Sequence, residues 1–231
     1  GILYNAMLLD HGMFPYVDSV ELKAPGTFYL AHVVATPGGR GIGAFQLWAN
    51  LVALASLLGV AGIAWRLWGL RAACFAAALY ALHDGFLDSM DANYVTWAQL
   101  PQILAFGAAV EATRAGHSRR RTLVLWLFAG LFGGFAALCK RPVGVVTGVV
   151  GLWALLHRGP LVKPGQPAPK GWHRYALDIP AGFAVTFGVV LAHAPIFVHY
   201  AIGGHVGGLV DGYLLNRWGM RYLAERGGAG W

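Results

Sequence analysis

Six apolar stretches separated by short polar segments run along the chain, at residues 44–65, 72–87, 92–110, 122–139, 142–157 and 176–200. A helix needs about 20 apolar residues to cross a hydrocarbon core about 30 Å thick, so most of these lengths predict transmembrane helices. His83 and Asp84 interrupt the second stretch, and the short fifth stretch follows Lys140–Arg141, which predicts a helical hairpin. The expected fold is an all-α integral membrane protein, a polytopic bundle of about six transmembrane helices.

Two shorter apolar stretches, Ile2–Leu9 and Thr27–Thr36, precede the first span. Both are too short to cross a bilayer, so we expect them to form helices that lie in the membrane interface. The polar, proline-bearing segment His11–Gly26 separates them. The predicted organisation is an outer juxtamembrane loop at 1–43, a transmembrane bundle at 44–200, and the truncated start of a further outer segment at 201–231.

Composition supports this interpretation. Of the 231 residues, 57% are hydrophobic and 12% are charged, and mean hydropathy is +0.55. A soluble domain carries about 25% charged residues, twice this value. The net charge of +7 does not indicate nucleic-acid binding, because the basic residues gather in short clusters between the apolar stretches.

The clusters of basic residues predict how the bundle is oriented. Loops 66–71, 114–121 and 158–174 fall on one side and hold ten of the seventeen Lys and Arg residues. Short loops rich in Lys and Arg stay in the cytoplasm. Eight of the ten acidic residues fall on the opposite side, as expected of a working surface that needs carboxylates. We therefore expect a multi-pass protein of the plasma (inner) membrane, with residues 1–43 on the outer side.

The segment Pro15–Gly26 has the most informative polar pattern in the chain. It places Asp18, Glu21 and Lys23 within six residues, and Lys23 precedes a Pro–Gly turn into the next helix. A lysine in such a loop suits phosphate, and a carboxylate suits orienting a hydroxyl. A solvated loop with a snorkelling lysine explains the same residues. The residues alone leave both interpretations open.

The order of several motifs resembles the first outer loop of GT-C-type glycosyltransferases. These motifs are Gly1–Tyr4 (GILY), Gly12–Asp18 (GMFPYVD) and Lys23–Gly26 (KAPG), the last one residue away from the family's Lys-Pro-Pro-Gly form. The closest group is similar to the family 39 protein mannosyltransferases and the aminoarabinose transferases. Further along, Arg66–Gly69 resembles a basic-aromatic turn of these enzymes, and Gly130–Lys140 resembles their glycine-rich helix that ends in lysine.

The resemblance implies transfer of a sugar from a polyprenyl-phosphate donor to a lipid, glycan or protein acceptor at the outer face, by an inverting mechanism with a general base. It implies catalytic roles for Asp18 and Glu21. The implied substrate-binding residues are Tyr16, Lys23, Asp91, Asn93, Lys140 and Arg141. The family's catalytic aspartate, which would act as the general base on the acceptor hydroxyl, is expected just upstream of Gly1, so we expect this chain alone to be inactive.

Three aspartates raise the question of a metal. Asp84, Asp88 and Asp91 follow an i, i+4, i+7 spacing, so one helical face places all three together. Oxygen ligands of this kind suit a divalent cation. A polar helix end without metal explains the same spacing, and no cofactor is assigned.

Two glycine pairs, Gly130/Gly134 and Gly144/Gly148, predict close approach of neighbouring helices. The chain has no P-loop, His-Glu-x-x-His or Gly-x-Ser-x-Gly motif, so the sequence offers nothing for a soluble ATPase or hydrolase. Membrane lipids are expected partners, and nucleic acid is not. The alternatives to a transferase are a polytopic transporter and a non-catalytic lipid-binding protein; charges at the span ends favour an interfacial site over a transport path.

Overall fold

The computed structural model describes residues 1–35, 42–86, 93–114, 116–157, 177–217 and 220. Within these ranges every regular element is helical, which confirms the expected all-α class. The elements are α1 (Ile2–Asp10), α2 (Gly26–Ala35), α3 (Ile42–Trp68), α4 (Leu70–Phe86), α5 (Tyr94–Ala112), α6 (Arg119–Cys139), the 3₁₀ turn η1 (Arg141–Val143), α7 (Gly144–Leu156), α8 (Ile179–Ile202), α9 (Val206–Leu209) and the π-helical turn η3 (Val210–Leu214).

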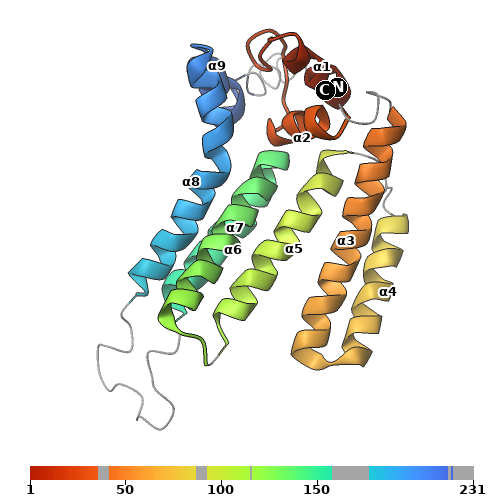
Figure 1. The fold of residues 1–231 in the computed structure, drawn as a ribbon, viewed down its shortest axis with the longest axis vertical. Coiled ribbons are helices and arrows are strands. Elements are labelled where there is room, and N and C mark those ends of the chain that lie inside the picture. The colour runs from red at the N-terminus through yellow and green to blue at the C-terminus, as the bar shows by residue number, and fades with distance from the viewer. Residues whose placement is uncertain (36–41, 87–92, 115, 158–176, 218–219, 221–231) are drawn as a thin grey trace, which may run out of the picture.

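Helices α3 to α8 lie side by side in a bundle, and the short helices α1 and α2 cover one end of it (Figure 1). In the part of the chain that the structure describes, three helices are long and apolar enough to cross a membrane: α3, α6 and α8. Helices α4 and α7 are apolar but shorter. By length and composition these helices indicate a membrane protein.

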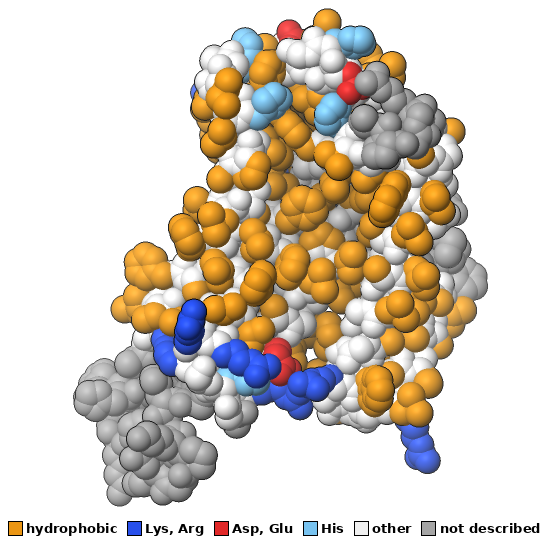
Figure 2. Space-filling model, in the orientation of Figure 1, with side chains coloured by type: hydrophobic (Ala, Val, Ile, Leu, Met, Phe, Trp, Pro, Cys, Tyr) orange, Lys and Arg blue, Asp and Glu red, His pale blue; other side chains and the backbone are white. Residues whose placement is uncertain are grey.

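The outward-facing surface of the helices is apolar around the middle of the bundle. Figure 2 shows hydrophobic side chains over the middle of one face, with Lys and Arg gathered at the end opposite α1 and α2. Trp48 and Trp65 of α3 are 46% and 65% exposed. At 1.5 Å per residue they are about 26 Å apart along the helix, close to the thickness of a hydrocarbon core. Exposed tryptophans at this separation are typical of the two interfaces of a membrane.

Glycines hold α6 against α8. A Cβ at Gly130 would overlap the Val185 carbonyl oxygen, and one at Gly134 would lie 2.9 Å from the Cα of Val189. Close packing at the first glycine pair is therefore confirmed. The second pair differs: a Cβ at Gly144 would make only ordinary contact with α6, 3.6 Å from the Cβ of Ala137, and one at Gly148 would have no atom within 4 Å because it borders a groove.

Basic residues gather at the end of the bundle farthest from α1 and α2, which we call the basic pole. Arg66 at the end of α3 donates to Glu111 Oε1 over 3.2 Å, and Arg114 and His117 also contact this carboxylate. Asp178, which caps α8, binds the Arg119 guanidinium through both oxygens at 2.5 and 2.6 Å. The structure thus places the described parts of loops 66–71 and 114–121 together, as the sequence predicts.

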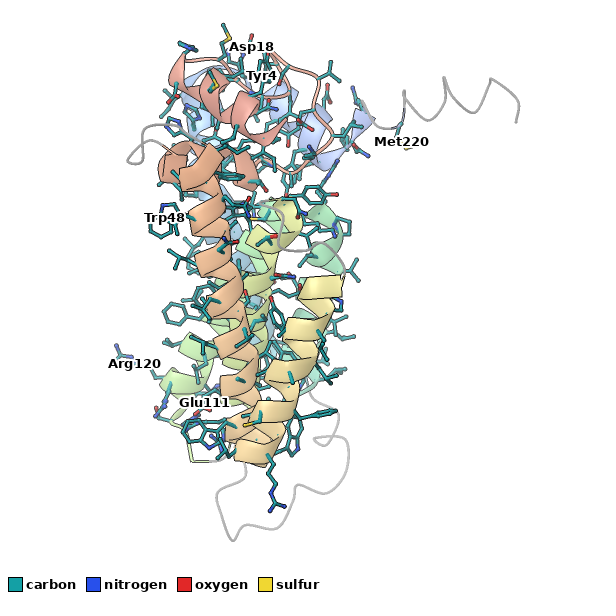
Figure 3. All side chains as sticks on the ribbon, turned by 90° about the vertical axis from the view of Figure 1, so that its right-hand side faces the viewer. Tyr4, Asp18, Trp48, Glu111, Arg120 and Met220 are labelled. Atoms are coloured by element: carbon teal, nitrogen blue, oxygen red, sulfur yellow. The ribbon has the colours of Figure 1, made fainter. Side chains whose placement is uncertain are left out.

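The opposite end, here the α1–α2 pole, is formed by both predicted interfacial helices and by residues 203–217. Tyr200 at the end of α8 donates its hydroxyl to the Pro15 carbonyl over 2.6 Å. Tyr16, Phe28 and Leu209 pack with it in one buried cluster. Figure 3 shows the separation of the two poles: Tyr4 and Asp18 lie at one end of the bundle, and Glu111 and Arg120 at the other.

Candidate functional site

A cavity of about 650 Å³ at the α1–α2 pole brings together Lys23, Lys140 and Arg141, and we call it the cation cavity. Tyr94 and Asn216 also line it. The cations come from segments more than a hundred residues apart in sequence, on either side of the α2–α6 contact. Among the described residues no carboxylate forms a salt bridge with any of the three cations. The Lys23 ammonium lies beside Gly1, where an added Cβ would be 3.0 Å from Nζ and 4.0 Å from Glu21 Oε2. The described lining of the cavity contains no carboxylate, so the cavity is electrostatically suited to an anion.

A close contact between α2 and α6 positions Lys23. Gly26 begins α2, and a Cβ added there would lie 2.7 Å from the Leu138 carbonyl oxygen. The neighbouring Thr27 hydroxyl donates to the Cys139 carbonyl oxygen over 3.1 Å. The start of α2 therefore docks on the last turn of α6, which places Lys23 beside the residues that follow α6. Glycine is needed in the Lys-Ala-Pro-Gly motif because the α6 backbone leaves no room for a side chain.

Tyr16 holds the loop rather than lining the cavity. Its side chain is only 3% exposed, and its hydroxyl donates to the Lys23 carbonyl oxygen. Burial raises the pKa of Tyr16 well above its ordinary value, which keeps the hydroxyl protonated as a donor. Its backbone has φ +70°, an uncommon conformation for tyrosine that forms the turn of the loop. The structure thus gives this predicted substrate-binding residue a contact that positions Lys23.

The two predicted catalytic carboxylates also bind the loop. Glu21 Oε1 accepts from the backbone amides of Leu22 and Lys23 at 2.9 and 3.1 Å, and Oε2 accepts from Asn5 at 2.9 Å. The exposed Asp18 accepts from the Phe14 amide at 2.6 Å through Oδ2. Neither carboxylate lines the cation cavity. Their catalytic role stays a prediction, and their hydrogen bonds fix the conformation of the segment that presents Lys23.

Lys140 and Arg141 enter the cavity where the chain leaves α6. Lys140 has an extended backbone, and its ammonium lies 5.6 Å from the centre of the Tyr94 ring, a cation–π contact. The Arg141 guanidinium donates to the Leu22 carbonyl oxygen and, over 3.3 Å, to the Tyr213 carbonyl oxygen. Arg141 therefore joins the loop to η3. A guanidinium has five N–H donors, so donors beyond these two contacts are available for a ligand.

Asn93 has a local structural role. Its Oδ1 caps α5 by accepting from the amides of Val95 and Thr96 at 2.7 and 3.4 Å, and the next residue, Tyr94, lines the cavity. Asp91 lies outside the described residues.

The structure offers no support for a metal in the part of the chain that it describes. No group of three His, Cys, Asp or Glu residues there is placed to hold a metal ion. Of the three spaced aspartates, Asp88 and Asp91 and the side chain of Asp84 lie outside the described part. A divalent cation at these aspartates therefore stays a prediction.

The sequence patterns did not indicate two residues that line the cavity, Tyr94 and Asn216. Tyr94 precedes the rest of α5 and contacts Lys140, which follows α6. Only the packing of α5 against α6 brings these two residues together. Asn216 has φ +48°, and its buried Oδ1 has no hydrogen-bond donor among the described groups. A buried amide oxygen without a donor is costly, and a ligand hydroxyl would satisfy it.

Comparisons with known proteins found no family model, no curated protein and no solved structure that matches this chain. The resemblance to GT-C-type glycosyltransferases is therefore based on the short motifs alone and stays a prediction.

Proposed function

We propose that this chain binds a lipid-linked phosphate in the cation cavity and belongs to a glycosyltransferase that uses a polyprenyl-phosphate sugar as donor. The observation that carries the proposal is the convergence of Lys23, Lys140 and Arg141 on one cavity without a paired carboxylate among the described residues. Charge-assisted hydrogen bonds from Lys and Arg to phosphate are short and strong, and Arg can bind two phosphate oxygens at once.

The level at which the cavity lies along the bundle suits a lipid headgroup. It lies at the end of α6, one of the membrane-length helices, and beneath the loop between α1 and α2. In the proposal all six helices α3 to α8 cross the plasma membrane, the basic pole faces the cytoplasm, and the α1–α2 pole lies outside. The three cations then stand at the outer interface, where the phosphate of a membrane lipid resides.

The proposed reaction moves a sugar from phosphate to an acceptor hydroxyl. The acceptor oxygen attacks the anomeric carbon and forms the new glycosidic bond, while the bond between that carbon and the phosphate oxygen breaks. The electron pair stays on the departing lipid phosphate, whose charge Lys23, Lys140 and Arg141 stabilise. A carboxylate accepts the hydroxyl proton. The resemblance gives this base role to the aspartate expected upstream of Gly1; of the two predicted catalytic carboxylates in this chain, Asp18 is exposed and has only its Oδ2 engaged.

One observation favours a second function, lipid-phosphate binding without transfer. Glu21 uses both carboxylate oxygens for hydrogen bonds to the loop, and neither Glu21 nor Asp18 lines the cavity. The cation cavity serves either function, so phosphate recognition and sugar transfer need separate tests.

The test reconstitutes the chain in lipid nanodiscs and compares binding of undecaprenyl phosphate with binding of undecaprenol, which lacks only the phosphate. We expect saturable binding of the phosphate and at least about tenfold weaker binding of the alcohol, a difference of about 1.4 kcal/mol. Equal binding would remove the basis of the proposal. Transfer is then measured with a radiolabelled undecaprenyl-phosphate sugar. Because the family's catalytic aspartate is expected upstream of Gly1, we expect this chain alone to bind the phosphate without transferring the sugar, and transfer by this chain would contradict that expectation.

A further inference from the structure

A groove of about 700 Å³ runs along the bundle from the cation cavity, between α7 and α8. Arg141 and Leu214 line both the groove and the cavity, so the two hollows adjoin at these residues. From there the groove follows α7 as far as Leu155, about 17 Å at 1.5 Å per residue. It therefore descends from the level of the cations along the apolar part of the bundle.

The groove exists because α7 carries glycines on the face that borders it, so no side chains of α7 fill this space. Gly144, Gly148 and Gly151 are spaced four and three apart, so they share one face of α7. Val185 and Val189 of α8 form part of the opposite wall. The hollow is thus an open channel whose walls are mostly glycine and aliphatic residues.

Polar groups gather near the end that meets the cation cavity. His193 Nδ1 donates a hydrogen bond to the Val189 carbonyl oxygen at 2.9 Å. Its Nε2 is therefore free of a proton and accepts a hydrogen bond from the Tyr213 hydroxyl at 3.1 Å. Both of these rings line the groove close to Arg141, which donates to the Tyr213 carbonyl oxygen. Farther along, two threonines, Thr147 and Thr186, line the groove; the Thr186 hydroxyl donates to a carbonyl of its own helix, and the other lining residues there are glycine or aliphatic.

We infer that this groove binds the hydrocarbon chain of the same lipid whose phosphate occupies the cation cavity. The inference rests on the proposed function and adds where the chain of the lipid lies. A molecule with one anionic end and one long apolar chain matches a hollow that has a guanidinium at one end and walls of mostly glycine and aliphatic residues beyond it. Because lipid surrounds the helices, the chain gains no hydrophobic free energy on entry, and its binding depends on close van der Waals packing against the glycine face.

The test fills the groove without disturbing the helix packing. Nothing lies within 4 Å of a Cβ at Gly148, so Gly148→Phe projects its ring into the groove rather than into a neighbouring helix. Gly62 of α3 is likewise exposed with nothing within 4 Å, and Gly62→Phe is the matched control. Gly148→Leu is a milder second variant. Thermal unfolding of each variant in nanodiscs shows whether it is folded.

Two probes separate the chain from the phosphate: undecaprenyl phosphate, and isopentenyl phosphate, whose single short unit reaches little of the groove. We expect Gly148→Phe to weaken binding of undecaprenyl phosphate at least about tenfold and to leave isopentenyl phosphate unchanged. Gly62→Phe should change neither.

Each other outcome has a defined meaning. Unchanged binding of undecaprenyl phosphate by folded Gly148→Phe overturns the inference, and so does equal weakening of both probes, which would locate the damage in the cation cavity. If wild-type protein binds neither probe, the proposed function itself fails. If Gly148→Phe instead changes only the oligomeric state, a helix of a second copy occupies the groove and the inference is wrong.

Discussion

The two Gly-x-x-x-Gly pairs have the same spacing, but Gly130 of the first and Gly148 of the second have opposite surroundings, so the same substitution at these two positions should have opposite effects. In Gly130→Ala the new Cβ would overlap the Val185 carbonyl oxygen and lie 2.7 Å from its carbonyl carbon. In Gly148→Ala the Cβ has nothing within 4 Å. The contact at Gly130 is with backbone, which cannot rotate away, so α6 and α8 must separate.

The size of the effect follows from two terms. Overpacking typically costs about 1–3 kcal/mol, and a contact between two backbones places Gly130→Ala near about 3 kcal/mol. Replacing glycine by alanine inside a helix returns up to about 1 kcal/mol at either position. We therefore expect Gly130→Ala to lower the free energy of unfolding by about 2 kcal/mol and Gly148→Ala to raise it by up to about 1 kcal/mol.

The assay is reversible unfolding in mixed detergent micelles, followed by far-UV circular dichroism as the fraction of denaturing detergent rises. Gly188→Ala provides an independent check from the other helix, because its Cβ would overlap the Leu127 carbonyl oxygen and lie 2.6 Å from the Leu131 amide nitrogen. Equal stability of Gly130→Ala and Gly148→Ala would refute the arrangement of α6, α7 and α8 described above.

Three further predictions concern the two poles. Gly26→Val should abolish binding of undecaprenyl phosphate in the nanodisc assay, because its Cβ would lie 2.7 Å from an α6 carbonyl oxygen and push the loop off the cavity; unchanged affinity would contradict this. Tyr94→Leu should weaken the same binding about two- to fivefold, since a cation–π contact with Lys140 is worth about 0.5–1 kcal/mol. Asp178→Asn should destabilise the fold by about 2 kcal/mol, because Arg119 loses a charged partner that is buried. Hydrogen bonds from Arg119 lower the pKa of Asp178 below its ordinary value of about 3.9, so this contribution is present above about pH 4 and is lost as pH falls through the lower native pKa; an acid titration of stability in which the wild type and Asp178→Asn run parallel would contradict it.

The helices could be predicted from the sequence because long apolar runs leave few alternatives for a backbone that must satisfy its own hydrogen bonds. The outcome of the two glycine pairs could not, because the spacing is identical and only the tertiary arrangement decides that Gly130 meets α8 while Gly148 meets open space. The sequence pattern determines which face of a helix carries small residues, and the tertiary fold determines which element packs against that face.

The residues of the candidate site were likewise only partly predictable from the sequence. The three cations were predicted as substrate-binding residues from the resemblance to the glycosyltransferase motifs, and the structure brings them to one cavity. The contacts of Tyr16 and Asn93 could not be predicted, since burial of the Tyr16 ring depends on α8 and η3, and capping by Asn93 depends on where α5 begins. Asn216 gave no signal, because a lone asparagine gains meaning only when its amide is found buried without a donor.

The most direct test of the central claim is the affinity of undecaprenyl phosphate for the triple variant Lys23→Gln/Lys140→Gln/Arg141→Gln in nanodiscs. The matched control removes three exposed cations from the basic pole, in Arg71→Gln/Arg120→Gln/Arg121→Gln. Each charged hydrogen bond to phosphate is worth about 1.5–3 kcal/mol, so the cavity variant should bind at least about a hundredfold more weakly while the control keeps wild-type affinity. Equal loss in both variants, or no loss in the folded cavity variant, would show that Lys23, Lys140 and Arg141 do not form a phosphate site.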